Sequence, residues 1–169
     1  MSLRALAWLI VASACVDPVF EAQLDALGPE APDVPAGPLH RPGQACLVCH
    51  DGAQSGVARY TVAGTVYAYR GEPEPAPGVH VELVDARGER FEAETNCAGN
   101  FYVRSDQLEP EYPLWTSLIA GDYRIDMQSR VGRDGSCGSC HGEPVSPSRT
   151  EPVYLFSLRG DALPETECP

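Results

Sequence analysis

Short segments that alternate apolar and polar residues recur from position 60 to position 158, and they constrain the fold more than any other feature. Alternation with a period of two places the apolar side chains on one face of a strand. Turn-forming residues separate the segments, as in Asn96–Asn100. The pattern predicts an all-β fold, a seven-stranded β-sandwich with strands near 62–68, 79–83, 91–95, 101–103, 114–119, 123–127 and 153–158.

Two copies of the motif Cys-x-x-Cys-His flank most of these segments, at positions 46–50 and 137–141. In this motif the two thiols add across the vinyl groups of haem, and the histidine becomes the proximal ligand of the iron. Zinc or a redox dithiol is the alternative, but paired cysteines of zinc ribbons are separated by only about 15–20 residues. We therefore expect two covalent haem c groups, attached through Cys46, Cys49, Cys137 and Cys140 and ligated by His50 and His141.

The sixth iron ligands decide the redox character of such haems, because axial methionine raises the reduction potential relative to histidine. His40 precedes the first motif by six residues and is one candidate. Met127 is the other candidate, although its alternation with Ile125 also suits core packing. His80 is expected on the outward face of the second strand, as a solvated surface residue. An iron without a protein sixth ligand remains a further alternative.

The N-terminal residues resemble an export signal. Arg4 precedes an apolar run at 5–12 that is too short to span a bilayer comfortably. Small residues then lead into Cys15, which resembles the lipidation site of bacterial lipoproteins; an ordinary cleaved signal is the alternative. We expect a signal peptide at 1–14, a lipidated Cys15 with a flexible Pro/Ala-rich acidic tether at 15–44, and a haem-bearing domain at 45–169.

The remaining cysteines, Cys97 and Cys168, are expected to form a disulfide or to remain two free thiols. If seven strands reverse direction in turn, the first strand starts and the sixth strand ends at the same pole of the sandwich. The two haem-binding loops should then be neighbours at that pole. The turn that holds Cys97 and the exit of the last strand toward Cys168 should lie at the other end.

Several segments also resemble a known family. Gly64–Tyr67, Pro77–Val81, Thr95–Val103 and Gly121–Ile125 follow the order seen in carboxypeptidase-regulatory-like domains. That resemblance implies a transthyretin-like, or prealbumin-like, sandwich of the broader Ig-like kind, without catalytic activity of its own. With a haem motif on each flank, the chain is similar to dihaem cytochrome-like bacterial lipoproteins.

The charge balance indicates which classes of partner the protein disfavours and which it favours. The chain has 24 Asp and Glu residues against 12 Lys and Arg, a net charge of -12, which disfavours nucleic acid as a partner. We expect an extracytoplasmic electron carrier that exchanges electrons with redox partner proteins, held to a membrane of the periplasm or cell surface by its lipid anchor. Two alternatives remain: a peroxidase-like or small-ligand-handling enzyme with one open iron, and a surface binding or structural module stabilised by haem.

Overall fold

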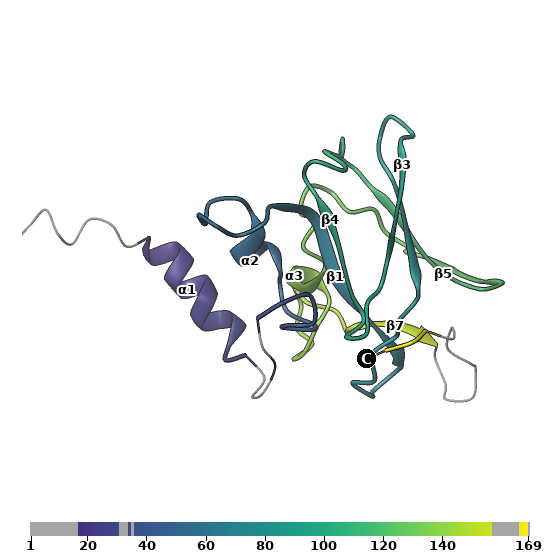
Figure 1. Cartoon of the computed structure of the whole chain (residues 1–169), viewed down its shortest axis with the longest axis horizontal. Helices are drawn as coiled ribbons and strands as arrows, with labels where there is room; N and C mark the ends of the chain where they lie inside the picture. The colour runs from purple at the N-terminus through teal and green to yellow at the C-terminus, as the bar shows by residue number, and fades with distance from the viewer. Residues whose placement is uncertain (1–16, 31–33, 35, 157–165, 169) are drawn as a thin grey trace, which may run out of the picture.

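The computed structural model describes residues 17–30, 34, 36–156 and 166–168 (Figure 1). This part of the chain contains seven strands in two packed sheets, so the predicted all-β sandwich is confirmed. The expected signal peptide at 1–14, Cys15 and the last two residues of the strand expected at 153–158 lie outside the described residues. One sheet has the order β4-β1-β7 and the other β3-β2-β5-β6, with strands β1 (Tyr60–Tyr69), β2 (His80–Val84), β3 (Arg90–Glu94), β4 (Asn100–Arg104), β5 (Trp115–Ala120), β6 (Tyr123–Asp126) and β7 (Val153–Phe156).

The strands reverse direction in turn, which decides where the motif loops emerge. β1 is antiparallel to β4 and parallel to β7, as strict alternation over seven strands requires. In the second sheet, β2 is antiparallel to both β3 and β5, and β5 is antiparallel to β6. No helix in the described part of the chain is long and apolar enough to cross a membrane.

The core lies between the two sheets and follows from the alternation of the sequence. In β2, Val81 and Leu83 are fully buried while His80 and Glu82 face outward. The other strands add inward-facing residues in the same way, among them Val62, Val66, Phe101, Val103, Leu118 and Leu155. Burial of these apolar side chains is the main stabilising contribution to such a domain.

β1 departs from this alternation, because six consecutive residues from Thr61 to Val66 are buried. One reason is the segment that leads into the second motif, in which Gly135 accepts a hydrogen bond from the N–H of Ala63 (3.0 Å). Another is the segment before the first motif, where the N–H of Gly43 donates to Oγ1 of Thr65 (2.7 Å). Both haem-motif regions therefore rest on the same strand.

The tether expected at 15–44 is not simply extended. Residues Pro18–Leu27 form helix α1. Asp17 caps its N-terminus, because its carboxylate accepts hydrogen bonds from the N–H groups of Val19 and Phe20. Proline in the first helical turn and an aspartate cap outweigh the Pro/Ala-rich composition on which the prediction depended. The end of α1 is held by Gln44, whose side chain donates to the carbonyl of Leu27 (2.9 Å).

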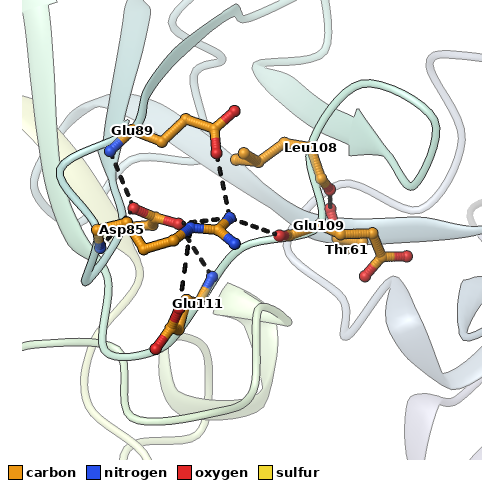
Figure 2. Close-up of polar contacts among 7 residues, drawn as sticks. Thr61, Asp85, Glu89, Leu108, Glu109 and Glu111 are labelled. Carbon is orange, nitrogen blue, oxygen red and sulfur yellow. Dashed lines mark hydrogen bonds and ion pairs between the residues drawn. The ribbon is translucent and has the colours of Figure 1, made fainter.

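A buried carboxylate connects two loops at one end of the sandwich (Figure 2). Asp85 is 2% exposed and accepts hydrogen bonds from the N–H groups of Arg87, Glu89 and Glu111. Burial alone would raise the pKa of Asp85, but these hydrogen bonds and the charge of Arg87 outweigh it and lower the pKa. The ionised carboxylate therefore joins the turn after β2 to the loop before β5.

Candidate functional site

Each Cys-x-x-Cys-His motif forms one turn of helix. Helix α2 (Leu47–His50) is closed by the N–H of His50 donating to the carbonyl of Cys46 (3.1 Å). Helix α3 (Cys137–Cys140) is closed in the same way by His141 and Cys137 (2.8 Å). Residues three apart share a helix face, so each turn directs its two thiols to one side. Figure 1 shows α2 and α3 between α1 and β1.

The two motifs lie in contact with each other. A Cβ placed on Gly138 would lie 2.3 Å from the carbonyl oxygen of Gln44 and 2.9 Å from the N of Ala45, just before the first motif. On its other side the second motif packs on β1, where a Cβ on Gly64 would lie 3.1 Å from Sγ of Cys137. The motifs are thus neighbours at one end of the sandwich, as the strand directions predicted.

The first cysteine of each motif is partly buried. Burial raises the pKa of the Cys137 thiol to about 12, and the nearby Cys46 adds to this effect. Burial likewise raises the pKa of the Cys46 thiol to about 11. Cys140, in contrast, is exposed. The buried thiols are neutral at physiological pH, so they behave as apolar groups in the free chain.

The histidines of both motifs are oriented by main-chain carbonyl groups. Nδ1 of His50 lies 2.7 Å from the carbonyl oxygen of Ala58, and Nδ1 of His141 lies 3.1 Å from that of Glu151. A carbonyl oxygen only accepts, so each Nδ1 carries the proton and donates it. Nε2 of each neutral imidazole then keeps its lone pair, which is the arrangement found in metal-bound histidines.

His40 lies beside His50. Their ring centroids are 5.9 Å apart at an interplanar angle of 40°. His40 also directs Nδ1 to a carbonyl oxygen, that of Gly37, which again leaves Nε2 as the coordinating nitrogen. The two imidazole rings therefore lie close together at the first motif.

The other two ligand candidates lie in the opposite sheet. Nδ1 of His80 is 2.7 Å from Oε1 of Glu92, on the outer face of β2, as expected for a surface histidine. Met127 follows β6, where its N–H donates to the carbonyl of Thr116 (2.9 Å). The motifs instead pack against β1. The structure therefore brings His40 to the first motif, whereas Met127 follows β6, at the edge of the other sheet.

A cavity of about 640 Å³ separates α1 from the two motifs. Its lining includes Leu27 of α1, Val48 of the first motif and Ser139 of the second. Arg149 also reaches it; the guanidinium donates to the carbonyl oxygens of Gly138 and Glu143, while its buried Nε has no partner in the described chain. The intervening residues of both motifs thus border open space of a size typical for cofactor sites.

Cys97 and Cys168 form a disulfide with a Cα–Cα distance of 5.5 Å. They are the pair that remains after Cys15 and the two motifs have been assigned. Sequence reasoning did not identify Tyr60, whose ring stacks on His50, nor the carbonyl partners of the histidines. Main-chain carbonyls have no residue signature, and only the position of Tyr60 at the start of a strand after the first motif pointed toward it.

The recognition of this chain as a carboxypeptidase-regulatory-like, dihaem cytochrome-like lipoprotein is wrong. Within residues 17–30, 34, 36–156 and 166–168, no group of three or more His, Cys, Asp or Glu side chains is placed to hold a metal ion, although the resemblance implied an iron site at each motif. No family model, curated protein or solved structure matches the chain. The two sheets remain those of an all-β sandwich.

Proposed function

We propose that this protein carries two covalent haem c groups and transfers single electrons outside the cytoplasm. The observation that supports this most directly is the orientation of His50 and His141, which both donate Nδ1–H to a main-chain carbonyl and keep Nε2 for an axial bond.

The residues that would hold the groups divide into two sets. Cys46 and Cys49 would form the thioether bonds of one haem, each thiol hydrogen passing to a vinyl carbon, and His50 and His40 would hold its iron. Cys137 and Cys140 would attach the other haem in the same way, and His141 would hold its iron. When bound, the iron supplies reversible Fe(III)/Fe(II) exchange. The protein's part is to orient these histidines, to exclude water around the buried thiols and to hold the two motifs side by side.

Export and partners form part of the same proposal. Covalent haem attachment and the Cys97–Cys168 disulfide both suit an oxidising compartment. The apolar run at 5–12 and the small residues before Cys15 support export and lipid anchoring at a periplasmic or outer surface. The net charge of -12 favours redox partner proteins with a basic docking surface and disfavours nucleic acid.

A second function, the binding of a small ligand or peroxide at an open iron, is favoured by the positions of the candidate iron ligands. His40 lies against His50, whereas His80 and Met127 belong to the opposite sheet. Beyond the motif histidines and His40, the described residues contain only His80 and Met127 as further His or Met side chains. An iron held by His141 alone would have an open position, which would permit binding of a small ligand or peroxide.

The decisive experiment is a pyridine haemochrome assay combined with the intact mass of the exported, full-length protein. We expect two haems per chain, one haem in C46A/C49A and one in C137A/C140A. A wild-type protein with full export and no bound haem would refute the proposal. The H40A variant tests the axial pair, with H80A as the matched control: only H40A should convert one haem from a low-spin to a high-spin spectrum. A cyanide-induced shift in the wild type would favour the open-iron function, and its absence would favour electron transfer alone.

A further inference from the structure

A stack of three rings extends from the first motif onto the outer face of the three-stranded sheet. The ring of Tyr60 stacks on that of His50, with centroids 4.3 Å apart and planes at 14°. Tyr60 in turn stacks on Tyr102, at 4.8 Å and 16°. Aromatic pairs of this kind stabilise the structure beyond the burial of their surface. The planes are nearly parallel throughout, so the orientation of one ring restricts the next.

A local irregularity in β1 places Tyr60 in this stack. Simple alternation would direct Tyr60 to the same face as the buried Val62. However, the pairing of β1 with β4 shifts register between Tyr60 and Val62. An extra residue of this kind re-aims the neighbouring side chain. Tyr60 therefore lies on the outer face, which is also the face of Tyr102, because Phe101 and Val103 on either side of Tyr102 point into the core.

The stack limits rotation of the His50 ring. One restraint is the hydrogen bond from Nδ1 to the carbonyl of Ala58. A single hydrogen bond still permits the ring to swing about it, whereas a parallel ring against one face removes that freedom. With His40 nearby at 5.9 Å, both the direction of Nε2 and the twist of the imidazole plane are determined in the free chain.

We propose that Tyr60 is a positioning residue that sets the plane of the His50 imidazole by stacking, with Tyr102 supporting it from behind. This inference rests on the proposed function, because the imidazole plane matters for iron that His50 ligates. The ring of Tyr60 carries the effect and its hydroxyl group does not. Removal of the ring should therefore alter the electronic properties of the first haem and leave the second unchanged.

The test compares Y60L, which removes the ring, with Y60F, which keeps it, in the full-length, haem-loaded protein. Y102L removes the supporting ring alone, and Y123L on β6 is the control for loss of an exposed tyrosine. The readouts are haem content, the low-spin electron paramagnetic resonance signals and the ferric-to-ferrous ratio of each haem at a fixed applied potential. We expect Y60L to shift one low-spin signal and to change one ratio by up to about tenfold, the equivalent of a stacking energy. Y102L should act in the same direction with smaller effect, and Y60F and Y123L should match the wild type.

Normal signals and ratios in a fully loaded Y60L protein would overturn the inference, as would an equal effect of Y60F. If Y60L does not fold, Y102L and Y60F decide the question. The haem-free chain provides a separate readout, since nitrogen-15 spectra report whether the His50 proton is on Nδ1; Y60L should reduce that fraction and Y60F should not. Haem absent from the wild type would reject the proposed function, whereas two haems with unaffected variants would reject only this role of Tyr60.

Discussion

Replacement of Gly138 by alanine tests whether the two motifs are packed together, because the structure predicts the sign of the effect. Gly138 has no positive φ angle, so alanine is compatible with its backbone conformation. At such a position, Gly→Ala alone stabilises a protein by about 0.4–1 kcal/mol through the unfolded state. The isolated local effect would therefore make G138A more stable than the wild type.

The tertiary contact predicts the reverse. The new methyl group would lie 2.3 Å from the carbonyl oxygen of Gln44 and 2.6 Å from its carbon. Unstrained contacts between heavy atoms are about 3.5–4.0 Å, so the two main-chain segments must separate by about 1 Å. Overpacking of this kind costs about 1–3 kcal/mol. We expect a net loss of stability and a Tm lower by about 2–4 °C for each kcal/mol lost.

Urea and thermal unfolding of the full-length protein measure this difference, at equal haem content. S139A is the matched control, because Ser139 is the exposed neighbour in the same turn; it should remain within about 0.5 kcal/mol of the wild type. A G138A protein that is as stable as the wild type, or more so, would refute the contact between the motifs. It would also remove the basis for treating the two haems as immediate neighbours.

Three further predictions concern the disulfide, the buried Asp85 and the thiols of the second motif. The C97A/C168A variant should lose about 4 kcal/mol of unfolding free energy in urea, since the disulfide closes a 71-residue separation. The low pKa of Asp85 contributes stability that is present above its unfolded pKa of about 3.9 and is lost as the pH falls through the lower folded value. Urea midpoints measured between neutral pH and about pH 3 should therefore fall more steeply in the wild type than in D85N. In haem-free protein at about pH 8, iodoacetamide should label the exposed Cys140 well before the buried Cys137, whose pKa is about 12.

Each of these three predictions would be contradicted by a particular result. Unchanged stability in C97A/C168A would contradict the disulfide, provided that free-thiol counts confirm its absence from the variant. Parallel pH profiles of wild type and D85N would show that the Asp85 carboxylate is not stabilised in the folded state. Equal labelling of the two thiols, read by peptide mass spectrometry, would contradict the burial of Cys137 under β1.

Much of the fold could be predicted from local patterns. The alternation in Val79, Val81 and Leu83 identifies β2 because inward and outward faces succeed each other along any extended chain. β1 was predicted within a few residues, although its outer face is also buried. The segment before the first motif was predicted less well: composition indicated an extended tether, but Asp17 and Pro18 start a helix. Capping acts through particular hydrogen bonds, which average composition does not represent.

The sequence by itself determined the motif residues, the positions of the strands along the chain and the two cysteines left for a disulfide, because each is a property of neighbouring residues or of their number. Only the tertiary structure decided that His40 lies beside His50, that Gly138 contacts Gln44 and that Tyr60 stacks on the first motif. Gly138 and Gln44 are far apart along the chain and meet because both motif regions cover β1. The Tyr60 stack depends on a register shift, and a shift of one residue moves a side chain to the opposite face. The alternating pattern of the sequence does not indicate where such a shift occurs. The shift is seen only in the pairing of β1 with β4.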